Sequence, residues 1–110
     1  MVIGIKAFGG KMSVDSKTES GVLYIRVSGR FDFNAHKEFR EATNKIVEGI
    51  KKIEVDLSAT DYLDSSALGM LLLLRDKMSG DKHAVAIKGA QAEVKKILEI
   101  ANFGKLFTLV

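Results

Sequence analysis

The chain has 110 residues, of which 46% are hydrophobic and 28% charged, as in one soluble globular domain. It contains no cysteine, which excludes disulfides, a thiolate nucleophile and cysteine-based metal centres. The longest apolar run, around residues 68–74, is far shorter than the ~20 residues of a membrane span, so we expect no membrane insertion. The 17 basic residues are scattered along the chain, which argues against direct binding of nucleic acid.

Residues 1–11 form an N-terminal extension that lacks the continuous apolar core and the small-residue cleavage site of a secretory signal. We expect either an added edge strand or a disordered tail there. Residues 12–110 contain no proline, repeat or low-complexity tract, which predicts a single domain without an internal linker. Because the chain also lacks cysteine, we expect a cytoplasmic protein.

The first half of the chain predicts a hairpin followed by a helix. A strand near residues 11–17 and a turn over 18–21 precede a strand over 22–27 with Leu23, Ile25 and Val27 on one face. Apolar residues then recur at helical spacing, which predicts a helix over 35–50 with Asn34 as its N-cap. The apolar positions of this helix are Ala35, Phe39, Ala42, Ile46 and Ile50.

The second half alternates strands and helices. Residues 53–57 have the alternating pattern of a strand buried on one face. After a polar loop, we expect a helix from 65 to about 79 capped by Asp64, a strand over 84–87, a helix over about 90–101 and a final strand over 106–110. This order predicts a two-layer α/β domain, with a mixed, mostly parallel sheet of four to five strands and helices on one face.

The start of the helix at Ser65 is the most informative segment. Asp64, Ser65 and Ser66 bring a carboxylate and two hydroxyls to a helix N-terminus that follows a strand, where active sites of parallel sheets collect. The unpaired N–H groups and partial positive charge of a helix N-terminus tolerate a phosphate, although Asp64 opposes it. A phosphoserine adds about two negative charges, enough to repel a partner. The segment is therefore a candidate phosphorylation switch.

The same helix predicts a docking surface. Gly69 lies one turn beyond the hydroxyls and lets a partner's backbone approach, and a glycine inside a helix costs about 1 kcal/mol relative to alanine. The expected core stripe consists of Ala67, Leu71, Leu74 and Met78. The expected outward strip, which offers a partner apolar anchors, consists of Ser66, Met70, Leu73 and Lys77.

Each feature also has a purely structural explanation. Asp64 before two serines is a common helix start, and spacing alone favours simple capping over a switch. The apolar run at 71–74 fits a helix buried on most sides equally well, and Gly69 fits close packing of a helix on a sheet. The residues alone indicate a binding domain with a candidate hydroxyl switch.

Two separated segments resemble the signature of STAS domains of the bacterial anti-sigma factor antagonist type. The first is Gly29-Arg30-Phe31-Asp32 with Asn34. The second is Asp56-Leu57-Ser58 followed by Leu63-Asp64-Ser65-Ser66-Ala67-Leu68-Gly69. The likeness runs from about residue 21 to residue 107, and it includes the region where a helix leads into Asn102-Phe103 and a last short strand. The resemblance implies a STAS-like fold.

The resemblance also implies a role in partner switching. The family's phosphorylation site carries over to Ser65, with Ser66 as its neighbour and Asp32 as a supporting acidic residue in partner or kinase recognition. Unphosphorylated, such a protein binds an anti-sigma factor, often itself a serine kinase, and a PP2C-type phosphatase restores this form. The resemblance and the predicted docking surface together give the expected partner-binding residues, which are Asp32, Asn34, Asp64, Ser65, Ser66, Gly69, Met70 and Leu73. No catalytic residue, cofactor or metal is implied.

Two departures from the family pattern affect which partner the protein binds and whether it forms a weak homodimer. Ala67 stands where the family usually has glycine, which should stiffen the start of the helix. Many relatives have a further helix after the last strand, whereas this sequence stops at Val110.

Two other functions compete. An enzyme with Ser65 as nucleophile needs a base, and His36 and His83 both fit surface positions better. Three acids, Asp56, Asp61 and Asp64, could hold a hard cation but are more often caps and turn residues. A constitutive STAS adaptor subunit of a transport or signalling complex would use the same surface without a phosphate cycle. The serine at position 65 favours the switch over the adaptor.

Overall fold

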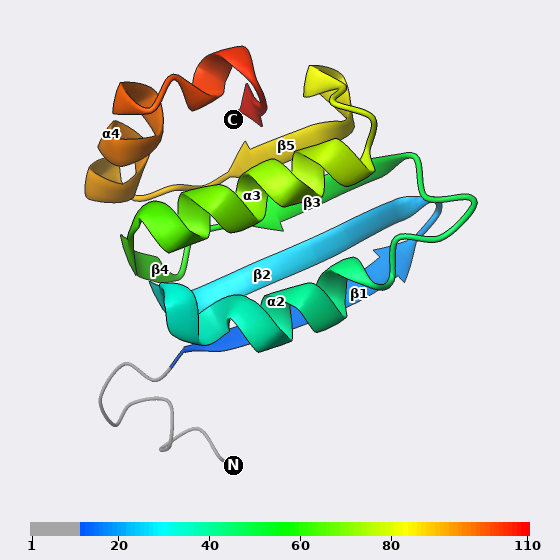
Figure 1. Ribbon diagram of the computed structural model, residues 1–110, viewed down its shortest axis with the longest axis horizontal. Helices are drawn as coiled ribbons and strands as arrows, with labels where there is room; N and C mark the ends of the chain where they lie inside the picture. The colour runs from blue at the N-terminus through cyan, green and yellow to red at the C-terminus, as the bar shows by residue number, and fades with distance from the viewer. Residues whose placement is uncertain (1–11) are drawn as a thin grey trace.

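A six-stranded sheet forms one layer of the computed structural model, which describes residues 12–110 (Figure 1). β1 (Ser13–Glu19) and β2 (Val22–Phe31) form the antiparallel hairpin. β3 (Lys52–Asp56), β5 (Val85–Lys88) and β6 (Thr108–Leu109) continue the sheet in parallel, in the order β1-β2-β3-β5-β6. β4 (Thr60–Leu63) pairs in parallel with the end of β2. The two predictions for the extension at 1–11 lie outside the described residues.

The helices form the second layer. α2 (His36–Thr43) and α3 (Ser65–Lys77) lie side by side across one face of the sheet (Figure 1). α4 (Ala92–Ile100) places Val94 and Leu98 in the same hydrophobic core. Short 3-10 helices precede α2, β5 and β6, namely η1 (Phe33–Ala35), η2 (Lys82–Ala84) and η3 (Phe103–Lys105). The predicted two-layer, mostly parallel architecture is therefore confirmed, with one strand more than expected.

The predicted helix over 35–50 is wrong beyond Thr43, where α2 ends. Ile46 and Ile50 still pack against the core, but they do so from turns in which their N–H groups donate to the carbonyls of Thr43 and Val47, each at 3.0 Å. Asn34 is not the N-cap that the sequence predicts. The cap of the preceding 3-10 helix is Asp32, whose side chain accepts a hydrogen bond from the Asn34 N–H.

The polar loop expected after β3 is in fact the strand β4. Thr60 explains why a polar segment can enter the sheet: its side chain is buried, and its hydroxyl donates to the Val27 carbonyl at 2.7 Å. The Gly29 N–H donates to the Ala59 carbonyl at 2.9 Å, and the register shifts between Gly29 and Arg30. β2 therefore runs on to Phe31, four residues beyond the predicted end, and pairs first with β3 and then with β4.

The other predicted elements are confirmed with shifted ends. Asp64 and Ser65 start α3 as predicted. β5 and α4 begin one and two residues later than expected, and the last strand shortens to two residues because η3 occupies the turn before it. Within residues 12–110, no helix is both long enough and apolar enough to span a bilayer.

Candidate functional site

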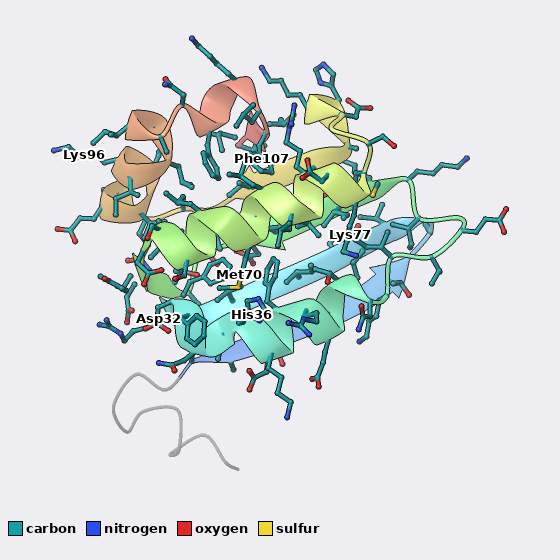
Figure 2. All side chains as sticks on the ribbon, viewed as in Figure 1. Asp32, His36, Met70, Lys77, Lys96 and Phe107 are labelled. Atoms are coloured by element: carbon teal, nitrogen blue, oxygen red, sulfur yellow. The ribbon has the colours of Figure 1, made fainter. Side chains whose placement is uncertain are left out.

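The pairing of β2 with β4 brings the two sequence segments together. Phe31 of β2 is the register partner of Leu63 of β4, and an aspartate follows each of them directly. Because parallel strands end at the same edge of a sheet, Asp32 and Asp64 leave the sheet at neighbouring positions. Figure 2 shows Asp32 at the end of the sheet where α3 begins. The acidic residue and the serine pair predicted as one site therefore lie at one end of the molecule.

Ser65 is the first residue of α3, and it is exposed. The Asp64 carboxylate accepts a hydrogen bond from the Ala67 N–H at 3.1 Å, which confirms Asp64 as the N-cap. The N–H groups of Ser65 and Ser66 have no partner within the helix, as in any first turn. Ser66 is half-buried. The Ser65 hydroxyl is thus the more accessible of the two, at a helix end that tolerates negative charge.

Asp32 is held in place by bonds on both of its carboxylate oxygens. One oxygen accepts from the Asn34 N–H at 3.0 Å, and the other lies 3.4 Å from Nε of Arg30. The Arg30 guanidinium in turn lies over the Tyr62 ring, 4.0 Å from its centroid. This chain of contacts fixes the Asp32 side chain, which is only 15% exposed, beside the start of α3.

Three residues of this end were missed by the sequence analysis. Arg30 and Tyr62 face each other because they are register partners in β2 and β4, and the second strand was expected to be a loop. Phe33 is 69% exposed and stacks on His36, with 6.1 Å between ring centroids. A large aromatic residue between Asp32 and Asn34, two predicted site residues, is the signal that could have identified Phe33.

The two faces of α3 are mostly as predicted. Ala67, Leu71 and Leu74 are fully buried, and Leu73 is 59% exposed. The prediction that Met70 points outward is wrong, because Met70 is only 5% exposed. It faces the neighbouring helix α2 and lines the space between α2 and α3, where a helix with two neighbours buries a wider face (Figure 2).

Gly69 lies on an open part of the α3 surface. It is exposed, and a methyl group added there would meet no atom within 4 Å. Close packing of helix on sheet therefore does not explain this glycine. The methyl group of Ala67, in contrast, is buried in the core.

Asp56 and His36, two of the other candidate residues, have structural partners. Burial alone would raise the pKa of Asp56, but hydrogen bonds from Ser58 and the charges of Arg26 and Lys88 outweigh it and lower the pKa below its ordinary value. His36 contacts Arg40, and no hydrogen bond joins His36 or His83 to Ser65 in the described part of the chain. Residues 12–110 hold no cluster of three or more potential metal ligands.

Comparison with known proteins identifies the family. The chain matches the model of the STAS domain over residues 13–110. It is 47% identical to a STAS-domain containing protein of Pseudomonas aeruginosa (strain UCBPP-PA14) over 87 residues, covering 79% of this chain and 86% of that protein. The chain therefore belongs to the STAS domain family.

The fold is also similar to two solved structures. An anti-sigma factor antagonist from Mycobacterium paratuberculosis matches with a TM-score of 0.77 and 21% identity, over 92% of this chain and 86% of that one. The phosphorylated form of the Bacillus cell fate determinant SpoIIAA matches with a TM-score of 0.66 and 14% identity, over 91% of each chain. The architecture is thus that of known anti-sigma factor antagonists.

Proposed function

We propose that this STAS domain is an anti-sigma factor antagonist that acts by partner switching. Unphosphorylated, it binds an anti-sigma factor through the end of the molecule where η1 and α3 begin, and thereby frees a sigma factor for transcription. A serine kinase, which in this family is often the anti-sigma factor itself, phosphorylates Ser65 and ends the binding. A PP2C-type phosphatase restores the binding form. We place this cycle in the cytoplasm, and we assign the chemistry to the kinase and phosphatase.

The exposed Ser65 at the start of α3 is the observation that carries the proposal. Its hydroxyl is accessible to a kinase, and the helix N-terminus tolerates the added phosphate without unfolding. The phosphate would stand beside the Asp64 and Asp32 carboxylates, so the local charge becomes strongly negative. A partner that recognises the neutral serine would therefore lose both its fit and its favourable electrostatics.

The surrounding surface supports the same role. Asp32, Asn34 and Gly69 are the predicted partner-binding residues that flank Ser65, with Leu73 further along α3 as an exposed apolar anchor. Phe33, Tyr62 and Arg30 add aromatic and guanidinium groups, which are enriched in protein interfaces. Met70 contributes through the side of α3 that faces α2.

A pull-down from the cytosol of the source cell tests the proposal. Wild type and Ser65→Ala should retain an anti-sigma factor, and Ser65→Asp should lose it while its circular dichroism spectrum stays that of a folded protein. Ser79→Asp adds the same charge beyond the other end of α3 and should still bind. Mass spectrometry should find phosphate on Ser65 in wild type and in Ser66→Ala. Equal capture by Ser65→Ala and Ser65→Asp would replace the switch with a constitutive adaptor.

A further inference from the structure

A groove of about 490 Å³ runs between α2 and α3, away from the Ser65 hydroxyl. Phe39 of α2 and Met70 and Leu74 of α3 make its floor, and all three are almost fully buried. Leu73, which is 59% exposed, forms part of the wall. Figure 2 shows His36 and Met70 on facing sides of this space, with Lys77 further along α3. The groove therefore has an apolar floor between the two helices, and Leu73 is the apolar side chain that it exposes most.

The rim of the groove carries cations that are not neutralised by an ion pair. Arg40 and Lys77 line it together with one carboxylate, Asp76. The two ion pairs found within residues 12–110 are Arg30 with Asp32 and Lys88 with Glu54, so neither rim cation takes part. Nη2 of Arg40 lies 3.4 Å from Nδ1 of His36. Because a guanidinium only donates, the imidazole accepts this contact and supplies no counter-charge.

The spacing of these groups indicates the shape of the occupant. Met70 and Lys77 are seven residues apart on α3, which places them about 10 Å apart along the helix axis. Arg40 lies on the opposite wall, one turn along α2 from His36. A cation on each wall, beside an apolar stretch about 10 Å long, fits an extended partner with several carboxylates better than an amphiphile with a single charged head group. An α-helix of a few turns presents apolar residues at i, i+4 and i+7 together with flanking acids.

We propose that the groove between α2 and α3 binds an acidic amphipathic helix of a partner protein. The apolar face of that helix would pack on Met70 and Leu73, and its carboxylates would pair with Arg40 and Lys77. The α3 wall of the groove continues toward Ser66 at steps of three and four residues, so the site adjoins the end of the molecule that carries Ser65. The test of the groove uses the unphosphorylated chain and no anti-sigma factor, so it can succeed or fail separately from the switch.

Nuclear magnetic resonance titration of the full chain tests this site. The probe is a synthetic peptide of about four helical turns, with leucines at i, i+4 and i+7 and glutamates flanking them. A second peptide has glutamine in place of every glutamate. The glutamate peptide should shift the amide signals of the groove residues and bind more tightly than the glutamine peptide. No binding of the glutamate peptide, or shifts located mainly on the open face of the sheet, would overturn the proposal.

Matched variants distinguish binding of the peptide in the groove from nonspecific association with the surface. Arg40→Gln should weaken binding of the glutamate peptide about tenfold, the value of one charge-assisted contact, and Asp76→Asn should strengthen it. Leu73→Ala should also weaken it. Lys37→Gln, on the same helix but outside the groove, and Leu72→Ala, the next exposed leucine, should leave it unchanged. Equal effects of Arg40→Gln and Lys37→Gln would contradict the proposal, and so would occupation of the groove by decanoate without any response to the peptide.

Discussion

The open face of the sheet and the helical face differ in how their exposed side chains are satisfied. On the open face, Lys88 pairs with Glu54 at 3.2 Å, and Nζ of Lys17 lies 5.5 Å from the centre of the Tyr24 ring. Asp56 lies within the electrostatic influence of Arg26 and Lys88. Several polar groups of the open face therefore have partners on that same face.

The helical face leaves comparable groups without such partners. Leu73 and Phe33 expose large apolar side chains, and the charges of Arg40 and Lys77 lack an ion pair within the described residues. Gly69 exposes helix backbone in open space. Exposed apolar area and unpaired charge on one side of a small domain are features that a partner completes. The contrast supports placing the proposed binding surface on the helices.

Removing a leucine from either side of α3 sharpens this comparison most strongly. Leu71 is fully buried, so Leu71→Ala should lower the free energy of unfolding by about 2–5 kcal/mol through lost burial and a cavity. Leu73→Ala removes the same atoms from an exposed site. It should therefore change the free energy of unfolding by less than about 0.5 kcal/mol. Urea denaturation measures both. Similar losses for the two variants would show that Leu73 belongs to the core and not to a docking surface.

The cap of α3 should have a smaller effect. Asp64→Ala removes the acceptor for the Ala67 N–H and should lower the free energy of unfolding by about 1 kcal/mol. Asp64→Asn keeps a capping oxygen and should stay close to wild type. Asp61→Ala, at an exposed position of the neighbouring strand, is the control. If thermal or urea unfolding does not distinguish the Ala variant from the Asn variant, the cap does not stabilise the helix.

Gly69→Ala should affect stability and binding in opposite directions. Because an added methyl group meets no atom within 4 Å, the variant should gain about 0.5–1 kcal/mol in the free energy of unfolding. The same methyl group would hold the partner's backbone away, so the affinity for the anti-sigma factor should fall. Calorimetric unfolding and isothermal titration measure the two effects. A stabilised variant with unchanged affinity would remove Gly69 from the interface.

The smallest effect is expected at Asp56 on the open face. Its pKa is lowered in the folded state, so its ionised form stabilises the fold at neutral pH. This contribution is fully present above the ordinary aspartate value and is lost as the pH falls through the lowered pKa. Asp56→Asn should therefore cost a little stability at pH 7 and none in strong acid, and salt should shrink the difference. Urea denaturation at a series of pH values measures the difference in midpoint between wild type and Asp56→Asn. A difference that does not change with pH would contradict this prediction.

The sequence predicted the elements whose signals are local. Alternation in β2 and β3 and the cap at Asp64 depend on neighbouring residues. The structure confirms the cap and both strands, although β2 extends four residues further than predicted. The errors lie where distant pairing decides. Thr60 enters the sheet only because β2 offers the Val27 carbonyl, and Met70 is buried only because α2 lies beside α3. Ile46 lies at the spacing expected for a buried helix residue, but it packs against the core from a turn and not from a helix.

The candidate site followed the same division. Ser65, Asp64 and the exposed Leu73 could be placed from spacing along one helix, and the family resemblance added Asp32. Arg30 and Tyr62 required the β2–β4 register, which no local pattern revealed. Local sequence patterns therefore predict the centre of the candidate site, at Asp64 and Ser65. The surrounding residues Arg30 and Tyr62 depend on the long-range pairing of β2 with β4.

The most direct test of the account is the affinity of the purified anti-sigma factor for protein carrying phosphoserine at position 65. Isothermal titration should compare this form with the unmodified protein and with protein carrying phosphoserine at position 66. We predict tight binding of the unmodified protein, loss of binding with phosphate on Ser65, and recovery after treatment with a PP2C-type phosphatase. Equal affinity of the unmodified protein and the form phosphorylated at Ser65 would contradict the switch.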